Sequence, residues 1–267
     1  MKQQFNLFVL IALPFLALAQ GPINGFMPVK GQWDIATTYS QENYEEFYDE
    51  EGLSTQRSIM QQSYNLYVEY GLDAKTSFVF TAPYISHNDD NKGLQDASMW
   101  VKYRNDRIKK DGGMLNFITS FGLSVPLSKY PTDNIAAIGN RASTVHGRFL
   151  MQYEANYGWF VQVQSGLDFQ FSPEAVAAFP LLIKGGIGTK WLYFDLWFEY
   201  FQALGQNAQG NQQAVGTGST WNKLGTTIYV PIQPWIGAFV GGATVLSGKN
   251  IGAGNRLNIG LVFRIVP

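Results

Sequence analysis

From Gln32 to the end of the chain, apolar and polar side chains alternate with a period of two. In the segment 159–171 the odd positions are mostly apolar or aromatic, whereas the even positions include Gln162, Gln164 and Asp168. The same alternation recurs at 63–70, 115–125, 192–200 and 257–265. A period of two places the two kinds of side chain on opposite faces of a β-strand, while a helix would scatter them. The sequence therefore predicts an all-β chain.

About twelve such segments can be counted, near residues 32–48, 59–72, 75–86, 95–107, 113–127, 143–157, 159–172, 180–190, 191–203, 219–232, 235–247 and 255–266. Short links are expected at 71–75, 156–158, 189–190 and 233–234, and longer ones near 49–58, 87–94, 128–142, 172–179, 202–218 and 247–254. The link 107–113 takes a short position but is expected to be longer. Short and long connections at alternate ends, with an even number of strands, are typical of outer-membrane barrels.

Composition indicates which face of the strands meets lipid. Only 15% of the residues are charged, against about a quarter in an ordinary soluble domain. The apolar face is rich in aromatic residues, and the opposite face carries mainly Asn, Gln, Ser and Gly. Aromatic residues also gather beside the short links, as an interfacial girdle requires; these are Tyr70, Tyr103, Tyr157, Trp159, Trp191 and Trp235. We therefore predict a transmembrane antiparallel up-and-down β-barrel of about 12 strands rather than a soluble β-sandwich.

The first residues are typical of an export signal. Lys2 precedes the apolar run 5–18, and Ala17-Leu18-Ala19 fits the small-x-small cleavage pattern. The run is shorter than the roughly 20 residues that a spanning helix needs, which disfavours an N-terminal membrane anchor. We expect residues 1–19 to be a signal peptide and residues 20–267 to form one barrel domain in the outer membrane of a Gram-negative bacterium.

The last predicted strand carries a further signal. Residues 258–265 resemble the polar-x-Gly-x-x-aromatic-x-apolar sequence by which the barrel assembly machinery recognises its clients, and Val266 and Pro267 follow it. The expected partners are this machinery, membrane lipid, lipopolysaccharide and a small-molecule solute. An acidic cluster near the first long loop either attracts cations and lipopolysaccharide or is simply solvated; it comprises Glu42, Glu45, Glu46, Asp49, Glu50 and Glu51.

Three segments together resemble one known family. They are Tyr70 to Phe78 running on to Ala82-Pro83-Tyr84, then Gly93-Leu94-Gln95-Asp96-Ala97 followed by Val101-Lys102-Tyr103-Arg104, and finally Gly122 to Pro126. They are similar to elements of the meta-pathway phenol-degradation-like outer-membrane transporters, over roughly a quarter of the chain. Gln95 stands where that family has a glycine. The resemblance implies a barrel of about twelve strands that passes small, often hydrophobic or aromatic, compounds.

Charged residues on the polar face are the candidate lumen lining. With the strands phased as above they are Glu69, Asp96, Lys102, Arg104, His146, Arg148, Glu154, Asp168, Lys184, Asp195, Glu199 and Arg264. They could select solutes, or they could form an internal network of ion pairs and hydrogen bonds that fills the barrel. Eight strands are filled by side chains and sixteen to eighteen leave a water channel, so twelve lies between the two. Partial occlusion by loops or by residues 20–30 is compatible with a pore.

The sequence offers little for catalysis or cofactors. It contains no cysteine and only two histidines, and its net charge of −1 argues against nucleic-acid binding. His87 lies in a polar loop without the spacing of a calcium site. His146 has Ser143 and Thr144 nearby, and a twelve-stranded outer-membrane phospholipase uses a Ser-His pair. That site faces lipid, however, whereas His146 is phased inward, so we predict no catalytic residue, no metal and no cofactor.

These observations favour a passive outer-membrane channel for small solutes, hydrophobic or aromatic ones among them, without enzymatic activity. One alternative is a plugged structural or interaction barrel that presents its extracellular loops to a partner. Another is a lipid-modifying barrel enzyme that uses His146 as its base.

Overall fold

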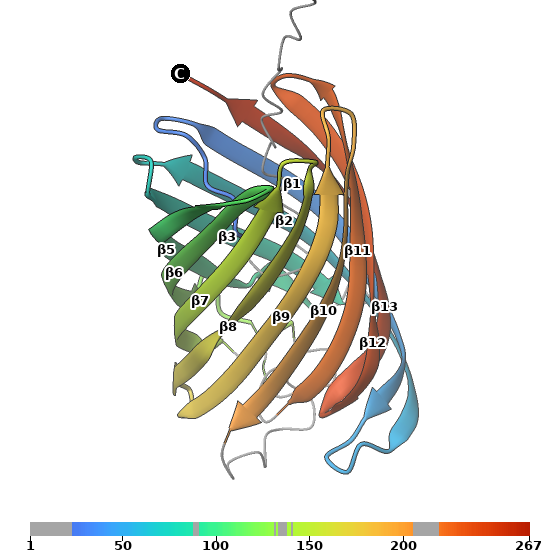
Figure 1. Cartoon of the computed structure of the whole chain (residues 1–267). Coiled ribbons are helices and arrows are strands. Elements are labelled where there is room, and N and C mark those ends of the chain that lie inside the picture. The colour runs from blue at the N-terminus through green and yellow to red at the C-terminus, as the bar shows by residue number, and fades with distance from the viewer. Residues whose placement is uncertain (1–22, 88–90, 131, 133–137, 140, 205–218) are drawn as a thin grey trace, which may run out of the picture.

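The computed structural model describes residues 23–87, 91–130, 132, 138–139, 141–204 and 219–267, and it forms a closed barrel of strongly tilted strands (Figure 1). The strands are β1 (Trp33–Tyr48), β2 (Ser54–Gly71), β3 (Thr76–His87), β4 (Asn91–Leu94), β5 (Asp96–Lys110), β6 (Gly113–Pro126), β7 (Ser143–Ala155), β8 (Trp159–Ser172), β9 (Val176–Gly188), β10 (Tyr193–Leu204), β11 (Thr220–Gln233), β12 (Ile236–Lys249) and β13 (Ile251–Ile265). The expected signal peptide, residues 1–19, lies outside the described residues.

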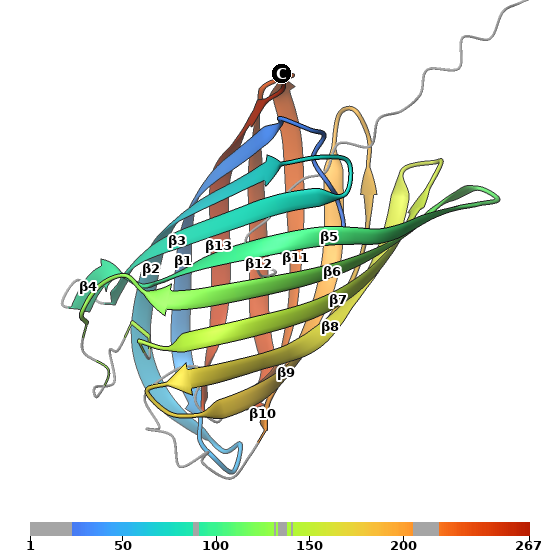
Figure 2. The ribbon, with the colours of Figure 1, turned by 90° about the vertical axis from the view of Figure 1, so that its left-hand side faces the viewer.

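Pairing confirms an antiparallel up-and-down barrel of twelve strands. Each barrel strand pairs with the strands before and after it in the sequence, and β1 closes the barrel by pairing with β13. The four-residue β4 pairs with the end of β3, inside the connection expected at 87–94, and β3 pairs with β5 along the rest of its length. The C-terminus lies at the end of the barrel where the short links are (Figures 1 and 2). This short-turn end is the periplasmic one in outer-membrane barrels.

Several strands run past their expected boundaries. β2 begins at Ser54 instead of 59, and β9 at Val176 instead of 180. The expectation of a longer link at 107–113 was wrong. β5 continues to Lys110, and Lys110 pairs with Gly113 across the two-residue turn Asp111-Gly112. Gly112 has φ +85°, a left-handed conformation that glycine adopts readily. The β5–β6 hairpin therefore extends well beyond the turns of its neighbours (Figure 2).

The long connection expected at 247–254 has an unexpected form. The β12–β13 ladder ends at the pair Thr244 and Asn255, so residues 245–254 form an arch. One arm of the arch pairs with β11, and the other pairs with β1. The alternation pattern could locate this connection. It could not show that the two arms pair with β11 and β1 instead of with each other.

Local hydrogen bonding explains the turn at 72–75. The Oδ1 of Asp73 accepts from the backbone N–H of Lys75 (2.7 Å) and of Thr76 (2.8 Å). This is how an aspartate side chain stabilises a turn. The Lys75 N–H in particular holds the pKa of Asp73 below its ordinary value. The short link predicted here therefore follows from one side chain.

Burial alternates along the strands as predicted. In β8 the even positions from Phe160 to Gln164 are enclosed while Trp159, Val161 and Phe169 are exposed on the outside. Girdle residues near the short turns are also exposed, among them Tyr157 at 87% and Trp191 at 72%. A large exposed apolar surface of this kind requires lipid around it. In the described part of the chain, no helix is long and apolar enough to cross a membrane.

Candidate functional site: the barrel lumen

The segment 23–31, ahead of β1, lies inside the barrel at its short-turn half. Ile23, Asn24 and Phe26 are buried there. Gly25 donates its N–H to Oε1 of Gln162 (3.1 Å) on β8. The backbone passes so close to β7 that a Cβ on Gly25 would lie 2.9 Å from the Cβ of Gln152. We call residues 23–31 the plug segment.

An aromatic pocket on the inner wall holds the plug segment. The ring of Phe26 meets Phe160 edge-on, with 5.2 Å between ring centroids, and it also contacts Tyr193 at 6.5 Å. Phe160 and Tyr193 stack on each other at 5.6 Å. The inner wall is therefore partly apolar where it meets the plug segment. Sequence analysis missed this because it followed only the polar members of the inward positions; the inward parity of Phe160 and Tyr193 was the available signal.

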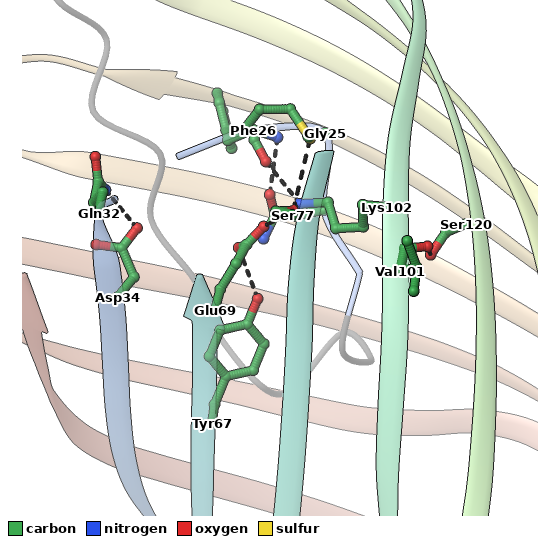
Figure 3. Close-up of polar contacts among 12 residues, drawn as sticks. Gly25, Phe26, Gln32, Asp34, Tyr67, Glu69, Ser77, Val101, Lys102 and Ser120 are labelled. Atoms are coloured by element: carbon green, nitrogen blue, oxygen red, sulfur yellow. Dashed lines mark hydrogen bonds and ion pairs between the residues drawn. The ribbon is translucent and has the colours of Figure 1, made fainter. Parts of the chain in front are cut away.

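A buried ion pair fixes the plug segment from the other side (Figure 3). The Nζ of Lys102 donates to Oε1 of Glu69 (2.8 Å) and to the carbonyl oxygen of Phe26 (2.7 Å). Glu69 also accepts from the hydroxyls of Tyr67 (2.9 Å) and Ser77 (2.7 Å). Lys102 and Glu69 are almost completely enclosed, so each satisfies the other in a site with little water. A wall charge thus holds the plug segment in place.

Other inward charges are paired along the wall. Arg264 Nε donates to Asp34 (2.8 Å), and Arg256 Nη2 donates to Glu42 (2.6 Å). Lys184 lies 4.0 Å from Asp195. Together with the Lys102–Glu69 pair and the pair of Arg148 with Asp168, these give five acid–base pairs among the described residues. The inner wall consequently carries both signs of charge in close balance.

The structure gives each of the twelve candidate residues a polar or charged partner. Glu69, Lys102, Lys184, Asp195, Asp168 and Arg264 are buried, and Asp96, Arg104, His146, Arg148, Glu154 and Glu199 are partly exposed. Asp96 accepts from the Tyr130 hydroxyl (2.6 Å), and Glu199 accepts from Nε1 of Trp221 (2.7 Å). Glu154 accepts from Asn116 and Gln152, and Arg104 donates to the carbonyl of Ala74 at the short-turn rim. The set therefore spreads over both halves of the barrel and does not form one cluster.

Sequence analysis placed Glu42 in a solvated acidic cluster, and this was wrong. Glu42 lies within β1, is 4% exposed and binds Arg256. Glu42 lies inside the strand expected at 32–48 and not in the loop expected at 49–58, so its parity within that strand already indicated an inward position. Asp34, Lys223 and Arg256 were missed in the same way, although their parity within their strands places them inward.

Near the long-loop end, three of the candidate residues meet two residues that were not candidates. His146 on β7 lies with Nε2 2.7 Å from Oγ of Ser124 on β6 and with Nδ1 2.6 Å from Oδ1 of Asp168 on β8. Arg148 donates to both carboxylate oxygens of Asp168 (2.6 and 2.9 Å). The Trp100 ring stacks on His146 with 4.7 Å between centroids. Sequence analysis considered Ser143 and Thr144 as partners of His146 and missed Ser124, because cross-strand register was unknown.

The loop between β6 and β7 is anchored at the same end. Tyr130 donates to Asp96, accepts from the N–H of Arg141 (2.9 Å), and packs with Ile85 and Ile138. Burial raises the pKa of Tyr130, and Asp96 raises it further, so the phenol stays protonated at neutral pH. The described residues contain no cluster of three or more His, Asp or Glu side chains that could hold a metal ion.

Comparison with solved structures identifies the class. The chain is similar to the COG4313 outer membrane channel from Pseudomonas putida F1, with a TM-score of 0.70 and 13% identity over 90% of this chain and 97% of that one. It also resembles the NanC porin (TM-score 0.53, 9% identity, 86% and 98% covered) and the KdgM porin (0.50, 8%, 85% and 98%). With the apolar outer surface, these likenesses make the chain a Gram-negative outer-membrane β-barrel.

The likeness defines the fold and leaves the particular family open. No protein-family model matches the chain, and no curated protein matches its sequence. The resemblance to the phenol-degradation-like transporters therefore stays a prediction.

Proposed function

We propose that this barrel is a channel for passive uptake of small, uncharged solutes, hydrophobic or aromatic ones among them. The observation that carries the proposal is the pairing of the wall charges. Five inner-wall carboxylates are each matched by a Lys or an Arg, which reduces the net field that a permeating solute meets. The aromatic rings of Phe160 and Tyr193 offer an apolar surface within that wall. The likeness to an outer-membrane channel and two porins supports the same function class.

The plug segment is the gate of this channel. It occupies the short-turn half of the lumen, where Lys102, Glu69, Gln152 and Gln162 are enclosed around it. It packs against the wall through Ile23, Phe26 and Met27, which belong to or border the buried apolar cluster of the lumen. Its hydrogen bonds to the wall are single ones, and its one backbone bond to a strand runs from the Gly31 N–H to the carbonyl of Gly71. Because this segment has no continuous backbone ladder with the barrel, it can leave the wall without breaking the pairing of any strand.

A disulfide lock tests both parts of the proposal. The chain has no cysteine, so Gly25→Cys with Gln152→Cys introduces one defined pair. Their Cβ atoms would start 2.9 Å apart and need a small shift to the roughly 3.5–4.5 Å of a disulfide. In planar bilayers we expect the oxidised variant to lose conductance and reductant to restore it. The two single-cysteine variants are the matched controls and should not respond to reductant.

The second candidate function is the plugged barrel that presents its loops to a partner. It is favoured by the complete burial of Lys102 and Glu69 beneath the plug segment. If the barrel is plugged, we expect no conductance from the wild type, from the oxidised or reduced double-cysteine variant, or from the single-cysteine controls. Conductance that is the same in the locked and reduced forms would instead retain the channel and reject the plug segment as its gate.

A further inference from the structure

The hydrogen-bonded row Ser124–His146–Asp168 crosses three neighbouring strands of the inner wall. Register sets it up: Gly122, His146 and Asp168 face one another across β6, β7 and β8, and Ser124 is the next inward residue along β6. All three side chains lie two to four residues from the long-loop ends of their strands. The hydrogen bonds of the plug segment are made in the short-turn half of the barrel, and its side chains reach this row only through the buried cluster that includes Trp100.

The protonation pattern of the row follows from its ends. Asp168 is held by both guanidinium nitrogens of Arg148, so it is ionised and can only accept hydrogen bonds. Nδ1 of His146 must therefore carry the ring proton and donate to Asp168. In the neutral ring, Nε2 is then the acceptor for the Ser124 hydroxyl, 2.7 Å away. A serine whose hydroxyl donates to a neutral imidazole, itself oriented by a carboxylate, is the arrangement that activates serine as a nucleophile.

The imidazole is also held in its plane. The Trp100 ring stacks on it at an interplanar angle of 23°. That ring occupies the space above Gly122, where a Cβ would lie 2.3 Å from Trp100 Cδ2. Arg148 lies over the other part of the same indole, 5.5 Å from its centroid. His146 therefore has a fixed orientation before any substrate arrives, which is what efficient proton transfer requires.

We propose that Ser124, His146 and Asp168 form an acyl-transfer site that hydrolyses small carboxylic esters entering from the long-loop end. Ser124 Oγ attacks the ester carbonyl while Nε2 of His146 takes its proton. The bond to the leaving alcohol then breaks, and the alcohol receives that proton. Water, deprotonated by the same nitrogen, attacks the acyl-serine. The bond between the acyl carbon and Oγ breaks, Oγ takes the proton back from Nε2, and the acid is released. Asp168 orients the imidazole and stabilises its charged form. The net reaction is ester plus water giving acid plus alcohol.

Stabilisation of the oxyanion has to come from a side chain, because the backbone N–H groups of these strands are engaged in the sheet. Thr144 lies directly opposite Ser124 in the β6–β7 register, on the inward face. Its hydroxyl is the donor that the register offers to the developing oxyanion. The site is independent of the proposed channel function, since it needs access only from one end of the barrel.

The test measures hydrolysis of 4-nitrophenyl acetate and labelling by a fluorophosphonate, using the whole barrel in detergent. We expect labelling at Ser124, and at least about a hundredfold loss of hydrolysis in Ser124→Ala and in His146→Ala. Thr144→Val should slow hydrolysis by about tenfold or more while Ser124 is still labelled. Ser120→Ala is the matched control, since Ser120 is an inward serine on the same strand without a histidine partner, and its hydrolysis should equal that of the wild type.

A second readout protects the test against misfolded variants. In this cysteine-free chain, a Ser124→Cys thiol beside His146 should react with iodoacetamide at least about tenfold faster than the same thiol in the double variant Ser124→Cys with His146→Ala. Equal thiol reactivity, together with wild-type hydrolysis no faster than that of Ser124→Ala, would reduce the row to a structural network and overturn the proposal.

Discussion

At the scale of single residues, the enclosed charges of the lumen depend on one another. Lys102 and Glu69 are both enclosed, and Lys102 also binds the plug segment through the carbonyl of Phe26. Removing one member of a buried pair leaves an unpaired charge in a poorly hydrated site, which costs far more than the pair itself contributes. Replacing only one member of the pair should therefore lower the free energy of unfolding by much more than the pair contributes when it is intact.

Replacing Lys102 by methionine should lower the free energy of unfolding by about 3–5 kcal/mol, because Glu69 is left buried without its cation. Adding Glu69→Gln should recover part of that loss. Urea unfolding in lipid vesicles, followed by tryptophan fluorescence, measures both. Lys75→Met is the matched control, since Lys75 lies in the exposed turn and should change stability little. A loss below about 1 kcal/mol in Lys102→Met would contradict the buried-charge argument.

Sequence could locate many of these residues but none of their partners. Parity within a strand was enough to place Glu69, Lys102 and Asp168 on the polar face. Whether Lys102 meets Glu69 across β3, or His146 meets Ser124 across one strand pair, depends on register. Register is set by turn lengths and bulges, such as the shift between Arg104 and Asp106, which alternation does not reveal.

At the scale of elements, alternation predicted twelve barrel strands because lipid and water impose opposite demands on the two faces of each strand. Where a strand no longer lies between lipid and water, alternation no longer predicts how the chain continues. β5 and β6 extend to a two-residue turn beyond the barrel wall, and residues 245–254 form an arch whose arms pair outward. In both places the chain no longer separates hydrocarbon from water, so the two-sided pattern weakens while strand pairing continues.

Two leucines near β10 test the depth dependence of the lipid face. Leu196 lies within the strand, whereas Leu192 lies beside Trp191 at the short-turn girdle, and both are exposed on the outside. Leu196→Arg should cost about 2–4 kcal/mol, because its guanidinium would sit near the middle of the hydrocarbon, and Leu192→Arg only about 0–1 kcal/mol. Equilibrium folding into lipid vesicles provides the comparison. Equal costs for the two variants would mean that this surface does not face a bilayer of the expected depth.

At the scale of the whole molecule, the barrel has an apolar outer surface that suits lipid and an inner wall on which five carboxylates pair with Lys or Arg. Sequence analysis named loops or residues 20–30 as the parts that could partly occlude the lumen. Of the second range, the described residues 23–30 lie inside the barrel as part of the plug segment, but their conformation could not be predicted. Gly25 and Phe26 carry no periodicity of their own, and their positions are fixed by a pocket assembled from β7, β8 and β10 together with Lys102 on β5. Such a pocket exists only once the barrel has closed.

Charge cancellation on the inner wall has a direct electrical consequence. With its pairs intact, the open channel should pass cations and anions about equally, so its reversal potential in a tenfold KCl gradient should lie near zero. Arg256→Met leaves Glu42 without its partner near the long-loop end and should shift the channel toward cation selectivity, whereas Glu42→Gln should shift it toward anions. The double variant restores neutrality and should return the reversal potential to the wild-type value. Strong selectivity in the wild-type channel would show that unpaired charge governs permeation, and the preference for uncharged solutes would then lose its physical basis.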